Sequence, residues 1–180
     1  MIEEIRAVMP AYRILDDERE FVLREWIRFG MTPEEVIRLE GSRGFRPREE
    51  GPDGKKGPLC FSGMDYRLYY EAEGSCLAGL PLSRFEYDFS MVKQRLYQFS
   101  YVFKGKSAFF PLSLALQAEY GPPNNRTGRK TVKYTLTLKD TVAARRNWIA
   151  GDGEENQVLI DLWLSGKDTC TLSCETWTYI

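Results

Sequence analysis

Residues 83–105, SRFEYDFSMVKQRLYQFSYVFKG, contain two runs in which aromatic side chains occupy every second position. These aromatic positions are Phe85, Tyr87, Phe89, Tyr97, Phe99, Tyr101 and Phe103. A period of two places side chains on one face of a β-strand. The stretch therefore predicts two half-buried strands joined by a hairpin turn at SMVKQ, with the aromatic face forming the core of a sheet.

The same period recurs on both sides of this hairpin. Residues 59–74 predict one or two strands, and Trp148 marks a further strand edge. Three later strands are expected over residues 133–140, 157–166 and 169–180, where apolar and polar residues again alternate. The distribution favours an antiparallel sheet that begins near residue 59.

Residues 30–41, GMTPEEVIRLEG, carry the start and stop signals of a short helix. Thr32 suits the N-cap, Pro33 suits the first helical position, and Glu35 completes a capping box with Thr32. Gly41 is expected to end the helix. A helix this short is not stable alone, so we expect it to pack on the sheet.

Two more helices are expected. Residues 16–29, DDEREFVLREWIRF, place acidic residues at the N-terminal end, where the helix dipole favours them, and Gly30 follows. Residues 107–120 repeat apolar side chains every four residues, and Gly121 follows. The packing positions of this second helix are Ala108, Leu112, Ala115, Leu116 and Tyr120.

Charge and composition exclude several kinds of site. The 180 residues are 43% hydrophobic, carry a net charge of −1 and contain no histidine. Such a chain is globular, and it has no global field that attracts nucleic acid. Without histidine, Ser-His-Asp and Cys-His catalysis and His-containing zinc sites are excluded within this chain. The aromatic stripes could otherwise stack bases, but a basic groove normally accompanies such a surface.

Two basic segments are candidates for an anion site. Residues 42–58 are rich in Gly, Pro and charge, which predicts a solvated loop, with an anion or nucleic-acid contact as the alternative. The basic residues of this loop are Arg43, Arg46, Arg48, Lys55 and Lys56. Arg145 and Arg146 beside Trp148 could form a cation–π or anion patch, and a solvated strand end is the other interpretation.

The four cysteines are Cys60, Cys76, Cys170 and Cys174. The last two share one face of a predicted strand but would lie ~13 Å apart, too far to bond each other. Small buried hydrophobic residues in a reducing compartment are expected. A Cys60–Cys76 or inter-strand disulfide in an exported protein is the alternative.

The expected fold class is α+β: an antiparallel sheet with helices packed on one face. A short helix followed by antiparallel strands occurs twice, so we expect two similar helix-plus-sheet halves. The boundaries would be 1–29 for an N-terminal extension with one helix, 30–106 for the first half and 107–180 for the second, all in one compact unit.

The opening of the first half resembles small α+β modules of the BamE/SmpA and β-lactamase-inhibitory-protein type. The matching positions are Gly30, Met31, Thr32, Glu34, Glu35, Val36 and Gly41. The helix ending EYGPP is similar to the Tyr-Gly-x-Pro ending in these modules, at Tyr120, Gly121 and Pro123. The resemblance implies a curved antiparallel sheet and a non-catalytic role in binding proteins. The lipid-attachment Cys of envelope modules has no counterpart here.

A second resemblance concerns residues 21–40, FVLREWIRFGMTPEEVIRLE, which look like the helices of DnaD-type replication modules. This resemblance implies contact with DNA or helicase. DnaD-type modules are helical throughout, whereas strand-rich sequence follows here.

We therefore expect a protein-interaction or structural module, more plausibly not an enzyme, with no cofactor, no metal and no assignable catalytic residue. Its partner would be another protein or a second copy, bound by aromatic side chains on the open face or edge of the sheet. A small-ligand binder or histidine-free enzyme, with a pocket between sheet and helices, is the alternative. The N-terminus lacks the apolar segment of a signal peptide, which favours a cytoplasmic protein unless a signal has been removed.

Overall fold

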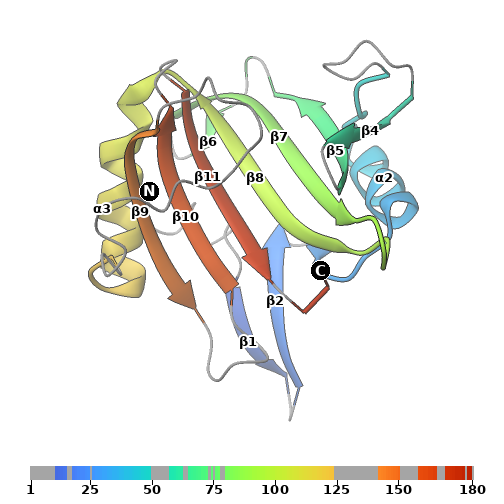
Figure 1. Cartoon of the computed structure of the whole chain (residues 1–180), viewed down its shortest axis with the longest axis horizontal. Coiled ribbons are helices and arrows are strands. Elements are labelled where there is room, and N and C mark those ends of the chain that lie inside the picture. Colours follow the sequence, from blue (N-terminus) through green and yellow to red (C-terminus); the bar gives the residue numbers. More distant parts are fainter. Residues whose placement is uncertain are drawn as a thin grey trace.

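An antiparallel β-sheet forms the body of the molecule, and two helices lie against it (Figure 1). The computed structural model describes residues 11–15, 18–24, 26–49, 57–62, 65–72, 74, 76–77, 80–123, 142–150, 158–165, 169–176 and 178–179. The α+β class with an antiparallel sheet is confirmed.

The strand order in the large sheet does not follow the chain. The strands run in the order β4 (Leu59–Ser62), β5 (Asp65–Glu71), β7 (Leu80–Ser90), β8 (Leu96–Lys104), β11 (Thr169–Thr176), β10 (Val158–Ser165) and β9 (Val142–Ala150), and β6 (Cys76–Leu77) pairs with β7. The hairpin predicted over residues 83–105 is confirmed as β7, β8 and the turn between them. The C-terminal strand β11 lies between β8 and β10.

One face of this sheet carries the hydrophobic core. The fully or almost fully buried members on the strands include Leu68, Tyr70, Phe85, Tyr87, Phe89, Phe99, Tyr101, Phe103, Trp148, Val158, Ile160, Leu162, Cys170, Leu172 and Cys174. Rings on neighbouring strands contact one another; Tyr70 stacks on Phe85 with centroids 4.8 Å apart. Because the aromatic side chains of β7 and the five other aromatic side chains named here are buried in the core, they are not available to anchor a partner.

Helix α2 (Pro33–Ser42) forms where the capping signals placed it. Thr32 and Glu35 make both bonds of the capping box. Two backbone bonds fix the entry to this helix: Gly30 N–H donates to Leu96 O at 2.8 Å, and Leu96 N–H donates to Met31 O at 2.8 Å. The predicted packing of a short capped helix against the sheet is confirmed.

A buried polar contact joins α2 to the sheet. Glu40, on the last turn of α2, is 0% exposed, and its carboxylate accepts a hydrogen bond from the hydroxyl of Tyr87 on β7. The bond holds the helix at one position over the aromatic face.

Helix α3 (Phe109–Tyr120) follows a 3₁₀ turn, η1 (Lys106–Ala108), and lies beside β9 and β10 (Figure 1). The predicted packing residues Ala108, Leu112, Ala115 and Leu116 are all buried; the side chain of Tyr120 lies outside the described part. Gly121, with φ of +80°, ends the helix as predicted.

The helix predicted over residues 16–29 is wrong. This segment forms β2 (Glu18–Arg24) and β3 (Ile27–Arg28), which pair with β1 (Ala11–Leu15) in a separate three-stranded sheet. Aromatic and β-branched residues such as Phe21, Val22 and Ile27 favour strands, and the run is too short for its periodicity to distinguish the two structures. The strand predicted over 133–140 lies outside the described residues.

Candidate functional site: the polar face of the sheet

The face of the sheet opposite the aromatic core is polar, because side chains alternate between the two faces. Its centre is one row of directly paired residues that crosses six strands: Tyr69, Glu86, Ser100, Ser173, Asp161 and Asn147. We call this face the polar face and this set the central row. The strand over Arg84–Ser90 was predicted to be half-buried, yet Glu86 and Asp88 are only 5% and 1% exposed. Glu86 and Asp88 are therefore nearly as buried as the aromatic side chains of β7.

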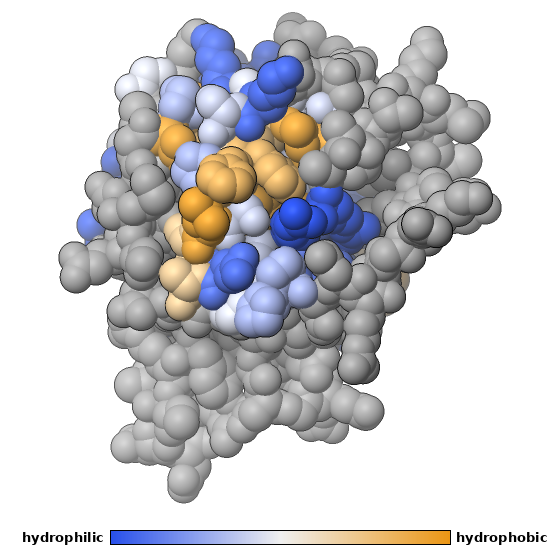
Figure 2. Space-filling model, turned by 90° about the vertical axis from the view of Figure 1, so that its left-hand side faces the viewer, coloured by the Kyte–Doolittle hydropathy of each residue, from blue (hydrophilic) through white to orange (hydrophobic). Residues whose placement is uncertain are grey.

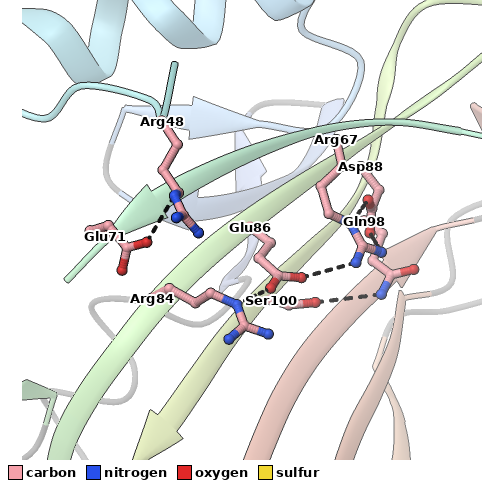
Figure 3. A network of polar contacts seen from close by, with 8 residues as sticks. All are labelled: Arg48, Arg67, Glu71, Arg84, Glu86, Asp88, Gln98 and Ser100. Atoms are coloured by element: carbon pink, nitrogen blue, oxygen red, sulfur yellow. Dashed lines mark hydrogen bonds and ion pairs between the residues drawn. The ribbon is translucent and has the colours of Figure 1, made fainter. Parts of the chain in front are cut away.

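The first ion cluster on the polar face joins β5 to β7 (Figure 3). Arg67 donates to both carboxylate oxygens of Asp88, with Nη2–Oδ2 at 2.8 Å. Its Nη1 lies 3.1 Å from Oε2 of Glu86, and Arg84 donates to the other oxygen of Glu86. Two buried carboxylates thus share two guanidinium groups.

The second ion cluster lies at the other end of the central row. Arg145 on β9 donates from Nε to Oδ1 of Asp161 at 2.8 Å and from Nη2 to Oδ2 at 2.5 Å. The hydrogen bond to Asp161 raises the pKa of Arg145. Both clusters use the bidentate geometry in which arginine matches a carboxylate. Because Asp88, Glu86 and Asp161 all bind arginine, none of these carboxylates is free to act as a general base.

Burial controls the protonation of Asp88. Desolvation raises its pKa to about 6, and the favourable charge and hydrogen bonds of Arg67 offset only part of that effect. The neighbouring carboxylates of Glu86 and Asp65 also raise it. Burial lowers the pKa of Arg67, but the nearby carboxylates, chiefly that of Asp88, raise it by more. The guanidinium therefore stays charged at every pH at which the protein is studied.

We expect the stability of the protein to depend on pH through Asp88. The folded-state pKa of Asp88, about 6, lies above the ordinary aspartate value of 3.8, so its contribution to stability is fully present below pH 3.8 and is lost as the pH rises through about 6. Urea unfolding of wild type and Asp88→Asn from pH 4 to pH 7.5 measures this. The free energy of unfolding of the wild type should fall relative to the variant as the pH rises, and a constant difference would contradict the assignment.

The middle of the polar face carries small hydroxyl side chains. Ser173 and Thr171 on β11 are each 6% exposed, and their side chains make no hydrogen bond with the described residues. Ser100 accepts only a long bond of 3.4 Å from Gln98 (Figure 3). Trp163 on β10 pairs directly with Thr171 and is partly exposed.

A second notable surface is the outer side of α3. Phe110 is 69% exposed and Leu114 is 53% exposed, one helical turn apart. Figure 2 shows apolar side chains gathered on this side of the molecule. Both the inner and outer sides of α3 are therefore apolar, which is typical of a helix with a second contact surface.

The basic segments do not combine into an anion site among the described residues. Arg48 pairs with Glu71 at 3.2 Å, and the guanidinium of Arg43 lies 4.5 Å from the ring centroid of Trp26. Arg145 lies on the polar face, while Arg146 pairs directly with the core residue Leu162 and so lies on the opposite face. The two arginines therefore do not form one patch. Lys55 and Lys56 lie outside the described residues.

Cys170 and Cys174 are buried free thiols, as predicted. Burial raises the pKa of Cys170 to about 12 and raises that of Cys174 as well, so neither is a reactive nucleophile. The side chains of Cys60 and Cys76 lie outside the described part, and the alternative of a bridge between them stays untested.

No cluster of three or more Cys, Asp or Glu suited to a metal ion occurs in the part of the chain that the structure describes. Within the same residues, neither helix is long and apolar enough to cross a membrane.

Comparison of the chain with family models, with characterised proteins and with solved structures gives no match. The resemblances to BamE/SmpA-like and DnaD-type modules stay predictions from short sequence patterns. Any function must therefore be argued from the surfaces described above.

Proposed function

We propose that the protein is a non-catalytic protein-interaction module that docks through the outer side of helix α3. The observation that carries the proposal is the exposure of Phe110 and Leu114 on a helix whose inner side is already buried against the sheet. Large apolar side chains exposed together are typical of protein-binding surfaces, and aromatic residues dominate the energy of such contacts.

The polar face supports a non-catalytic role. Catalytic carboxylates work with pKa values tuned to a reaction and with access to a substrate proton. Here Glu86 and Asp161 are almost fully buried and bind arginine side chains. Their arrangement stabilises neighbouring strands and leaves no acid–base pair.

We also infer that the chain consists of two similar halves, β5-β7-β8 with α2 and β9-β10-β11 with α3. A two-fold rotation between β8 and β11 exchanges β7 with β10 and β5 with β9 in the strand pairings. Under this rotation Arg67 takes the register position of Arg145, and Glu86 that of Asp161. In both halves the arginine on the outer strand binds a carboxylate that lies two positions before the residue with which the arginine is paired in the sheet. Arg67 binds Glu86 in this way, and Arg145 binds Asp161. This repeated diagonal supports a duplicated unit.

The docking surface can be tested by capture of partners from the source organism. A Phe110→Asp/Leu114→Asp variant should lose a partner that wild-type protein retains. Val92→Asp is the matched control, because Val92 is 91% exposed in the turn between β7 and β8, away from α3. Circular dichroism should first establish that all three proteins are folded. A partner retained equally by all three, or no partner at all, would contradict docking through α3.

A further inference from the structure

We propose that the outer side of α3 binds a second copy of this chain, so that two α3 helices pack antiparallel across a two-fold axis. This rests on the docking surface proposed above, and it identifies the partner of that surface. We call the exposed residues of α3 that face away from the sheet the outer stripe: Phe110, Leu114, Gln117 and Ala118. Their spacing of three and four residues places them on one side of the helix.

The outer stripe is apolar and uncharged. Residues 107–118, SAFFPLSLALQA, contain no charged side chain, and Phe110 and Leu114 are the most exposed apolar residues of the helix. A partner with a charged group at this contact would bury the charge without a compensating one, which is costly. A second copy brings only the same uncharged residues. Figure 2 shows hydrophilic residues bordering the apolar ones on this side, the arrangement of apolar centre and polar rim found in protein interfaces.

The sizes of the side chains match a two-fold contact. In a symmetric dimer, a residue that contacts a second residue of the partner is itself matched by the reverse contact. An antiparallel pair centred on Leu114 places position 110 opposite position 118, because both lie four residues from the centre. The ring of Phe110 then meets the small side chain of Ala118 at both ends of the contact, and Leu114 meets its own copy. Large residues opposite small ones allow facing helices to interdigitate at the density of a core.

The ends of α3 favour the antiparallel direction. The backbone amides give the N-terminal end of a helix a partial positive charge and the C-terminal end a partial negative charge. Lys106 lies in the turn directly before α3, and Glu119 lies in the last turn of the helix. An antiparallel pair places each positive end beside the negative end of the partner helix. A parallel pair would place like charges together and would set Phe110 against its own copy.

The length of α3 limits the strength of the contact. The helix has 12 residues and is therefore ~18 Å long. A contact of one such helix from each copy is smaller than the roughly 1,200 Å² at the lower end of stable interfaces. We therefore expect a weak, reversible dimer with a Kd on the order of 10 μM.

Sedimentation equilibrium of the full-length protein, over concentrations from about 1 μM to about 1 mM, measures the association. Wild type should show a reversible equilibrium between monomer and dimer. Leu114→Asp places two carboxylates together at the two-fold axis and should abolish the dimer. Val92→Asp is the matched control, because it adds the same charge at a position that is 91% exposed in the turn between β7 and β8. The dimer should be unchanged in this variant.

Two changes of side-chain size test the two-fold arrangement itself. Phe110→Ala leaves a gap, and Ala118→Phe places two rings against each other, so each should weaken the dimer about tenfold. The double variant Phe110→Ala/Ala118→Phe again places a large side chain opposite a small one, so its Kd should lie within about threefold of the wild-type value. Circular dichroism should first establish that every variant is folded.

Three results would overturn the inference. The first is a wild-type protein that stays monomeric at about 1 mM. If Phe110→Asp/Leu114→Asp then still loses a different protein in the capture experiment, docking through α3 remains supported; if nothing is captured, both proposals fail. The second is a dimer that persists in Leu114→Asp, which would place the contact elsewhere. The third is a double size variant that dimerises no better than its two single variants.

Discussion

Replacing Trp148 with alanine should lower the free energy of unfolding by about 3–5 kcal/mol, the range for deletion of a large buried aromatic side chain. Trp148 is 2% exposed on edge strand β9 and belongs to the apolar cluster that includes Leu112 and Leu116 of α3. Its Nε1 donates to the backbone oxygen of Gly121 at 2.9 Å, directly after the end of α3. One side chain therefore supports both the helix position and the edge of the sheet.

Urea unfolding measures the effect, and two variants separate its parts. Trp148→Phe keeps most of the ring but loses the bond to Gly121, so we expect it to cost about 1 kcal/mol through the hydrogen bond and somewhat more through lost volume. Trp163→Ala removes a partly exposed tryptophan of β10 that lies on the polar face. It should lower the free energy of unfolding clearly less than Trp148→Ala. Equal effects for Trp148→Ala and Trp163→Ala would show that α3 does not depend on the buried ring.

The local elements that were predictable are those with a long regular pattern or several agreeing signals. The aromatic alternation over residues 83–105 gave β7, β8 and their core face. Thr32, Pro33 and Glu35 together located α2 to within a residue or two. The segment over 16–29 lacked such agreement: its acidic start suggested a helix, while its aromatic and β-branched residues formed strands.

The polar face could not have been predicted, because it depends on pairings between distant parts of the chain. Arg67 and Asp88 are 21 positions apart, and they meet only because β5 and β7 pair in one register. A shift of one residue would turn every side chain of a strand to the opposite face. Ser100 and Ser173 come together only because the last strand enters the middle of the sheet. The acidic residues that alternate with the aromatic ones on β7 suggested a solvent-exposed face, whereas the neighbouring strands bury Glu86 and Asp88.

Replacing Arg67 with methionine should lower the free energy of unfolding by about 2–4 kcal/mol near pH 7.5. Removal of one partner leaves Asp88 and part of Glu86 buried without a compensating charge, which costs ~3–5 kcal/mol for a fully buried pair. The side chain of Arg67 is 26% exposed, so solvent screens part of that loss. Arg145→Met, at the register position that we infer to be equivalent, leaves one carboxylate without its compensating charge in place of two. It should therefore lower the free energy of unfolding by less.

The pH dependence of the Arg67→Met variant distinguishes lost charge compensation from lost packing. Without Arg67 the pKa of Asp88 should rise further above about 6, so Asp88 would be protonated and its burial tolerated at a higher pH. The deficit of the variant relative to wild type should therefore shrink as the pH falls from 7.5 to 4, and it should be smaller in the Asp88→Asn background, where only the loss at Glu86 remains. Lost packing of the arginine stem would cost the same at every pH and in both backgrounds. A deficit that is independent of pH would thus assign Arg67 a packing role.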